Sequence, residues 1–241
     1  MASTSSATAA GVPAPRMRHQ GPPLGVLAVI FTVLFCGGLL PVTTFGGRPY
    51  FPGPWESAGT IVAFFQTRPF AALLCAFFQF GSAIPLGIFT ATMVARLKFL
   101  GVRAAGLEIA AFGGLATAIG MIIGTSFLWA TTYPGVSSNA DLVQAIYRIA
   151  FGIGGPGYSV PFGLLAAGIS IPAAFSRLLP KWVVILGIGV GVVGVLSWFE
   201  MLNVQLVPLI PLTRFPGFVW IIAAGFTVGK RPSRVATSMI V

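Results

Sequence analysis

Six long apolar stretches divide the chain, and they limit its fold more than any other feature. Each is 18–27 residues long, and a helix rising 1.5 Å per residue needs about 20 residues to cross roughly 30 Å of hydrocarbon. Together they contain only two charged side chains, Glu108 and Arg214. The sequence therefore predicts an all-α fold, a polytopic transmembrane helix bundle of six spans, at residues 22–41, 70–95, 106–131, 149–175, 182–199 and 211–229.

The charged residues are few and unevenly placed. They make up 7% of the chain, against about 25% in soluble domains. This is too few to cover a water-exposed surface, so most soluble-enzyme functions are excluded. The net charge of +10 does not indicate a nucleic-acid partner, because Lys and Arg cluster in alternate loops. By the positive-inside rule, both termini are predicted to be cytoplasmic in a multi-pass protein of the inner (plasma) membrane. The inside set is Arg16, Arg18, Arg96, Lys98, Arg103, Arg177, Lys181, Lys230, Arg231 and Arg234, and the outside set is Arg48, Arg68, Arg148 and Arg214.

The pattern also predicts how the chain is divided. Residues 1–20 are small and polar and are expected to form a disordered cytoplasmic tail. Residues 21–230 form the transmembrane domain, and 231–241 a cytoplasmic C-terminal tail. Residues 141–157 belong either to the fourth span or to a separate outer helix, with a break at Gly154-Gly155-Pro156-Gly157. Residues 55–66 form either a plain loop or a short interfacial helix with Trp55, Phe64 and Phe65 facing lipid.

A glycine motif in the fifth span matches a nucleotide-binding fingerprint by letters alone. Residues 189–194 read GVGVVG, but the GxGxxG motif has meaning only between a strand and a helix, with an acidic residue about twenty positions later. Here it lies inside an apolar span. We therefore expect these glycines to allow close helix packing, with Gly187 and Gly191 on one face and Gly120 and Gly124 repeating the arrangement in the third span.

The side chains needed for most membrane chemistry are missing from the spans. His19 is the single histidine, and it lies in the N-terminal tail, so paired haem ligands and histidine-rich metal sites cannot be built. Cys36 and Cys75 are interpreted as small buried side chains. The interiors of the spans contain no carboxylate for proton coupling. We therefore predict a non-enzymatic protein with no catalytic residues, cofactor or metal.

Arg214 is the polar side chain that most requires an explanation. With the sixth helix starting at Pro211, Arg214 lies in its first turn, where the helix dipole disfavours a cation. Glu200 is the nearest acid in the sequence, and Asp141 with Arg148 forms another outer charge group. One hypothesis is an outer-face polar cluster of Arg148, Arg214, Glu200 and Asp141. The alternative is that Arg214 extends to lipid phosphates.

A weak internal repeat relates the second and fourth spans. The segment PLGIFTA from Pro85 resembles PFGLLAA from Pro161, although chance similarity between apolar helices is the alternative. If the repeat is real, the two prolines kink equivalent helices and open polar backbone toward a shared cavity. The polar side chains nearest these prolines are Gln79, Ser82, Thr90, Tyr158 and Ser159.

Two further segments carry a resemblance. The stretches LTRFPGFVW at 212–220 and RLLPKW at 177–182 resemble segments of small bacterial six-helix integral membrane proteins of unknown function. The resemblance covers roughly residues 58–230 and implies topology and class but no reaction.

The function expected from these observations is that of a binding, accessory or regulatory membrane component. The alternative is a small facilitator or transporter for a neutral or lipophilic solute, working as an oligomer. The expected partners are the lipid bilayer and either further copies of the chain or a membrane-complex subunit.

Overall fold

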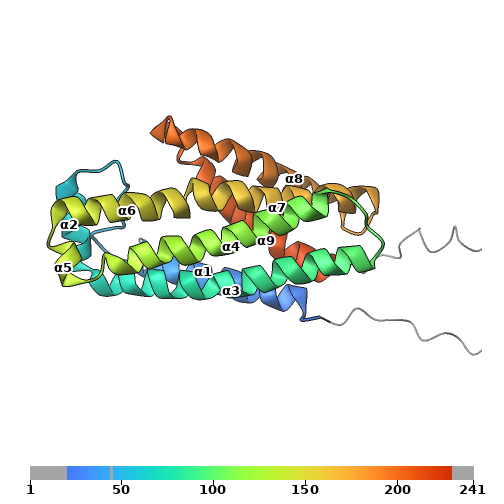
Figure 1. Ribbon diagram of the computed structural model, residues 1–241, viewed down its shortest axis with the longest axis horizontal. Helices are drawn as coiled ribbons and strands as arrows, with labels where there is room; N and C mark the ends of the chain where they lie inside the picture. The colour runs from blue at the N-terminus through green and yellow to red at the C-terminus, as the bar shows by residue number, and fades with distance from the viewer. Residues whose placement is uncertain (1–20, 44–45, 230–241) are drawn as a thin grey trace, which may run out of the picture.

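The computed structural model describes residues 21–43 and 46–229. Within these ranges the chain is helical and contains no strand. Six apolar segments are long enough to cross a membrane (Figure 1), which makes this a multi-pass membrane protein. In chain order they are α1 (Leu24–Leu39) with η1 (Leu40–Val42), α3 (Pro69–Phe99), α4 (Gly106–Ala130), α6 (Ala140–Gly154) with α7 (Pro156–Phe175), α8 (Lys181–Leu196) with η3 (Ser197–Met201), and η4 (Val204–Leu206) with α9 (Leu209–Thr227).

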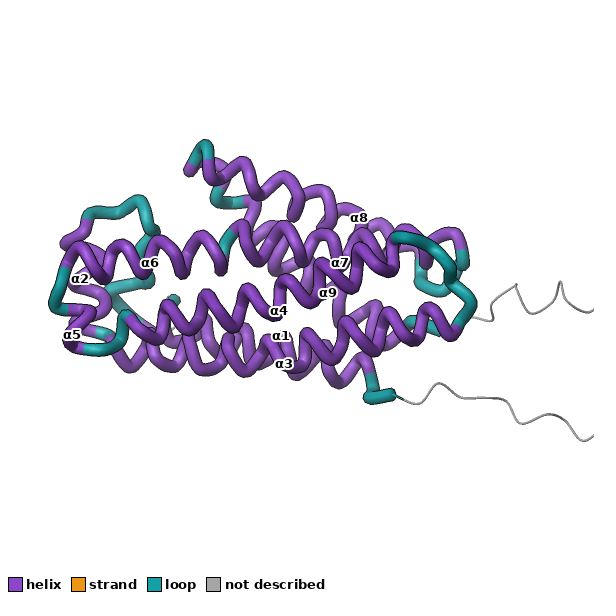
Figure 2. The backbone as a smooth tube through the Cα atoms, viewed as in Figure 1, coloured by secondary structure: helices purple, strands orange, loops and turns teal. Residues whose placement is uncertain are grey.

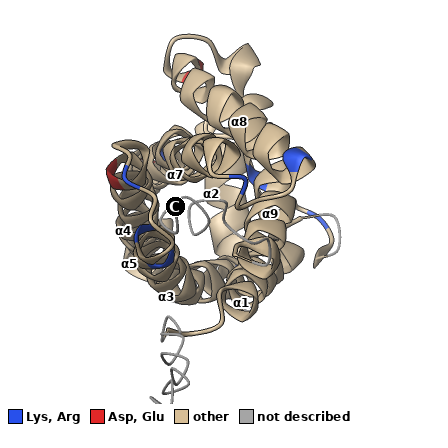
Figure 3. Cartoon of the chain, turned by 90° about the vertical axis from the view of Figure 1, so that its right-hand side faces the viewer, with Lys and Arg blue, Asp and Glu red and all other residues tan. Residues whose placement is uncertain are grey.

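Five of the long helices form a ring. Helices α1, α3, α4 and α7 contact one another in that order, and α9 closes the ring between α7 and α1, whereas α8 lies outside against α7 and α9 (Figure 3). Phe112, Ile185 and Val219 are among the large apolar side chains on the outer surface. An apolar outer surface of this kind fits a lipid bilayer.

Both ends of the described chain lie at the same end of the bundle. Helix α1 starts and α9 finishes on the right in Figure 1, where Gly25 packs against the ring of Phe226 and Gly225 packs against the backbone of Leu24. Having no side chain, the two glycines let the first and last helices approach closely. The predicted tails at 1–20 and 231–241 lie outside the described residues.

A small group of helices caps the opposite end of the bundle. We call α2 (Ala58–Thr67), α5 (Pro134–Ser137) and α6 the cap; they lie on the left in Figure 1. The Ser57 side chain starts α2 by accepting a hydrogen bond from the Thr60 N–H at 3.2 Å. Of the two alternatives for residues 55–66, the structure shows the short helix, starting at Ala58, with Trp55 just before it and 53% exposed.

The expectation that Phe64 and Phe65 face lipid is wrong. Both rings are fully buried, and they pack with Ile61, Val143 and Tyr147 in the core of the cap. A larger core, separate from this one, fills the ring of membrane-spanning helices. An apolar residue type alone does not distinguish a lipid-facing position from a protein-facing one, because both environments are apolar.

The fourth span contains the predicted break. Helix α6 ends at Gly154, Gly155 has φ −84° and ψ −100°, and Pro156 opens α7. Pro156 is acceptable at this position because the first turn of a helix needs no N–H donor there. Figure 2 shows the break as a short loop between two helices that follow one another in the same direction. Residues 141–154 therefore form a helix distinct from α7 that leads into it.

The glycines of the apparent nucleotide motif lie inside α8, as expected. Gly191 and Gly194 contact the backbone of α7, and a β-carbon at Gly187 would overlap Ser170 and Trp220. Gly187, Gly191 and Gly194 therefore have a packing role on the α7 and α9 side of α8, whereas a β-carbon at Gly189 would meet nothing within 4 Å. In α4, Gly124 packs against Ile153, whereas Gly120 makes looser contacts.

Candidate functional site

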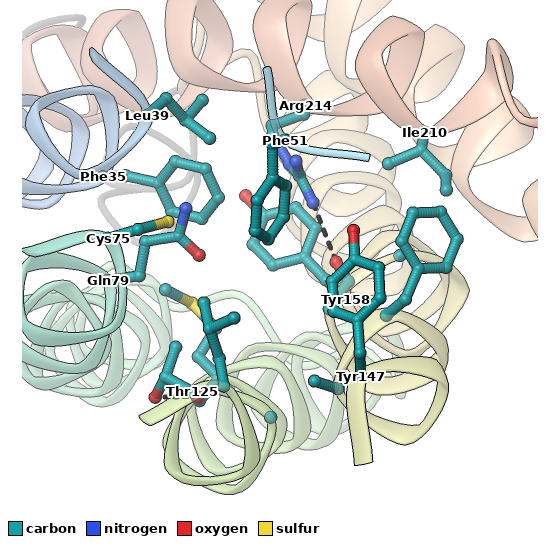
Figure 4. Close-up of a pocket in the computed structure, with 17 residues that line it drawn as sticks. Phe35, Leu39, Phe51, Cys75, Gln79, Thr125, Tyr147, Tyr158, Ile210 and Arg214 are labelled. Carbon is teal, nitrogen blue, oxygen red and sulfur yellow. Dashed lines mark hydrogen bonds between the residues drawn. The ribbon is translucent and has the colours of Figure 1, made fainter. Parts of the chain in front are cut away.

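A cavity of about 170 Å³ lies where the core of the cap meets the core of the bundle. We call it the Arg214 cavity. Five of the six membrane-spanning segments contribute to its lining, together with Phe51 from the segment before α2, and Figure 4 shows side chains converging on it. The members used below are Phe35 of α1, Cys75 and Gln79 of α3, Tyr147 of α6, Tyr158 of α7 and Arg214 of α9.

Arg214 is held by the broken end of α6. Its Nη2 donates a hydrogen bond to the Gly154 carbonyl at 2.8 Å, and Gly154 is the last residue of that helix. The C-terminal carbonyls of a helix carry the negative end of its dipole, so a cation is stabilised there. Helix α9 begins at Leu209, which moves Arg214 from the expected first turn into the second.

Two aromatic rings also contact the Arg214 guanidinium. Its central carbon lies 4.9 Å from the ring centroid of Phe35 and 5.0 Å from that of Tyr158, within the range of cation–π contact. Arg214 therefore points into the bundle and does not extend to lipid phosphates. The rings hold the cation in place but supply no formal negative charge.

Several polar groups around this cavity lack partners. The Arg214 Nε and the Tyr158 hydroxyl are both buried and without a hydrogen bond, and Tyr158 is only 1% exposed. The Gln79 side chain projects toward the cavity from α3 (Figure 4). No Asp or Glu is among the lining residues. The cavity thus presents one cation and unused donors within otherwise apolar walls.

Each of the four residues of the hypothesised outer cluster has different contacts. Arg148 reaches the Pro54 carbonyl with its Nε at 3.4 Å, Asp141 is exposed in the first turn of α6, and Glu200 lies in η3 with its Oε2 unpartnered. No hydrogen bond or ion pair joins any two of the four. In the described ranges the one salt bridge is Lys98–Glu108, at 2.7 Å and exposed. Within the described residues, Arg214 is bonded to the end of a helix and not to a carboxylate.

Two side chains that the sequence pattern did not single out form hydrogen bonds that hold the cap in place. Arg68 donates through Nη1 and Nη2 to the carbonyls of Pro41, Gly46, Gly47 and Pro49. Tyr147 donates its hydroxyl hydrogen bond to the Pro52 carbonyl. These bonds hold the segment before α2 beside the cavity, whose lining includes Phe51 of that segment.

Some of the residues at this site had a signal in the sequence. Gln79 and Tyr158 are two of the polar side chains noted near Pro85 and Pro161, which lie inside α3 and α7, and both line the cavity. Ser82, Thr90 and Ser159 are instead fully buried and do not line it. Cys75 is buried and Cys36 partly buried. In the described ranges no group of three or more His, Cys, Asp or Glu side chains is placed to hold a metal.

The chemistry available to the cavity is that of binding an anion. Arg214 offers a charged donor that is already oriented, and Tyr158 and Gln79 offer neutral ones. No protein-family model matches the chain, and neither does any curated protein or solved structure. The resemblance to small bacterial six-helix proteins stays a prediction.

Proposed function

We propose that the protein is a non-enzymatic membrane protein that binds a small organic anion in the Arg214 cavity. The observation that carries the proposal is the half-buried Arg214, whose Nε is buried without a partner, beside a cavity without a carboxylate. A buried charge lacking a counter-charge is costly. An anionic ligand would supply that charge and accept charge-assisted hydrogen bonds from the guanidinium.

The charge pattern supports an orientation for this site. Arg96, Lys98, Arg103, Arg177 and Lys181 lie in or beside the loops at the end of the bundle where the described chain starts and finishes, which favours the cytoplasmic side of a bacterial inner membrane. Gln79 is 19 residues before Lys98 on α3, about 28 Å along the axis. The Arg214 cavity then lies in the outer half of the membrane, closer to the cap than to the basic loops.

The proposal is tested by comparing benzoate with benzamide, which have similar shapes but differ in charge. The cavity volume is close to that of the roughly 150 Å³ cavity known to hold benzene. For the purified protein in mild detergent, benzoate at ten times its Kd should stabilise the fold by about 1.4 kcal/mol, read as a rise in Tm. Benzamide should give a much smaller rise.

Two substitutions of Arg214 and one control test whether Arg214 binds benzoate. Arg214→Gln should abolish the benzoate effect, whereas Arg214→Lys keeps the charge and should retain part of it. Arg148→Gln removes an equal charge from the cap, outside the cavity lining, and should leave the benzoate effect unchanged. Equal stabilisation by benzoate in the Arg214→Gln variant would refute the proposal.

A further inference from the structure

A second depression lies beside the Arg214 cavity, on the outer side of α3 and α4. Its volume is about 430 Å³, and it is open and mainly apolar. We call it the α3–α4 groove. Its lining includes Ala76, Phe77, Phe80 and Gly81 of α3 and Ser126 and Trp129 of α4. Phe77 is 68% exposed and Trp129 is 48% exposed, so this groove faces the surroundings of the bundle, which for a membrane-spanning surface is lipid.

The groove and the cavity are adjacent, and their linings share a residue. Thr125 of α4 lines both. On α3, Cys75 and Gln79 line the cavity, while Ala76 and Phe80, the next residues along the chain, line the groove. Ala76 and Thr125 are small side chains at this boundary between the Arg214 cavity and the groove.

The two spaces differ in size and in chemistry. The cavity of about 170 Å³ suits a head group close to the size of benzene, and it contains the cation. The groove is larger and has no charged side chain in its lining. A ligand that fills both must carry a compact anionic head on an apolar chain.

We infer that the ligand is a single-chain carboxylate of the fatty-acid type, with its head at Arg214 and its chain leaving between α3 and α4 into the groove. One guanidinium balances one negative charge, and its planar donors match the two oxygens of a carboxylate. A phosphate monoester would bring more than one charge. This inference rests on the proposed function, and it adds the class of ligand and its route from the lipid.

The position of the chain is tested with a photoreactive palmitate that carries a diazirine near its methyl end. The full chain is placed in nanodiscs of phosphatidylcholine, irradiated, digested and analysed by mass spectrometry. We expect the label on peptides that contain Phe77 or Trp129. Label found instead on cap peptides that contain Phe51 or Tyr147 would overturn the inference, while a positive benzoate result would still support the proposed function.

Paired variants separate the head from the chain. A β-carbon at Gly81 would meet nothing within 4 Å, so Gly81→Phe can start a bulky side chain in the groove. It should lower groove labelling about tenfold, equivalent to about 1.4 kcal/mol, and leave the benzoate response intact. Gly189 has equally open surroundings on α8, away from the groove, and Gly189→Phe should change labelling by less than about twofold.

Two further tests change Arg214 or the lipid composition of the nanodisc. Arg214→Gln should also lower groove labelling about tenfold, and unchanged labelling would overturn the inference, because the head would then be held elsewhere. Replacing phosphatidylcholine by phosphatidylglycerol should leave the label in place. Loss of the label there would identify a membrane phospholipid as the occupant and overturn the assignment to a free carboxylate.

Discussion

Gly187 and Gly189 are two residues apart on α8 but have different surroundings. A β-carbon at Gly187 would overlap the Ser170 hydroxyl and the Trp220 ring, whereas one at Gly189 would meet nothing within 4 Å. Trp220 and Ser170 are also joined there by a hydrogen bond from Nε1 to Oγ at 3.0 Å. Close packing against α7 and α9 therefore requires a glycine at position 187 but not at position 189.

This contrast gives a prediction for stability. Gly187→Ala should destabilise the protein by about 2–4 kcal/mol, because it forces α7 and α9 away from α8 and strains the bond between Trp220 and Ser170. Thermal unfolding in detergent measures the change. Gly189→Ala is the control, and it should be neutral or stabilising by up to about 1 kcal/mol through helix propensity. Similar losses in both variants would contradict the packing role.

At the scale of single residues, the sequence located Arg214 but not its partner. Its isolation in an apolar span was visible in the residue order, which offered Glu200 as the nearest acid. The group that meets it is the backbone carbonyl of Gly154, and every residue carries a carbonyl, so residue types cannot identify it. The break at 154–157 was the available signal, because it leaves helix-end carbonyls without partners.

At the scale of elements, the cap depends on hydrogen bonds from few side chains. Arg68 reaches four backbone carbonyls in the segment before α2. Arg68→Ala should remove these bonds and speed hydrogen exchange in residues 46–57, with little effect on the amides of α7. Arg48→Ala is the matched control, since the only described contact of the Arg48 side chain is with the Tyr50 ring. Unchanged exchange after Arg68→Ala would contradict this role.

Helix α6 has a side chain that fixes its start. The Asn139 Oδ1 accepts a hydrogen bond from the Leu142 N–H at 3.1 Å. Asn139→Ala should cost about 1 kcal/mol and increase exchange in the first turn of α6. Asn203→Ala removes a similar cap from the three-residue η4 and should cost less, because less helix depends on it. An equal or larger loss for Asn203→Ala would argue against the cap as the anchor of α6.

The spans were predictable as elements because length and hydropathy determine them. The start of α6 at Ala140 was less evident, because Asp141 and Arg148 interrupt its apolar pattern, while Val143 and Tyr147 face the core of the cap. The burial of Phe64 and Phe65 could not be inferred, since it depends on the approach of α6 to α2 from a distant part of the chain. Local sequence therefore predicted where helices form, but it did not predict which helices pack against one another.

At the scale of the whole molecule, the bundle has two different ends. One carries the cap, and the other carries the α3–α4 turn, with Ser138 and Ala104 as exposed positions at the respective ends. If the cap faces outward, a cysteine introduced as Ser138→Cys should react with an impermeant maleimide in intact cells. Ala104→Cys should react only after the cells are opened. The unaltered protein controls for Cys36 and Cys75, and the reverse labelling pattern would invert the orientation.

The exposed pair Lys98–Glu108 is the single salt bridge in the described ranges, and this has a consequence for ionic strength. Exposed pairs contribute little and are screened by salt, so the fold should unfold at nearly the same temperature in low and high sodium chloride. Packing of apolar side chains and close glycine contacts have no such dependence. Any salt sensitivity of carboxylate binding will therefore report on competition at Arg214 and not on loss of the bundle.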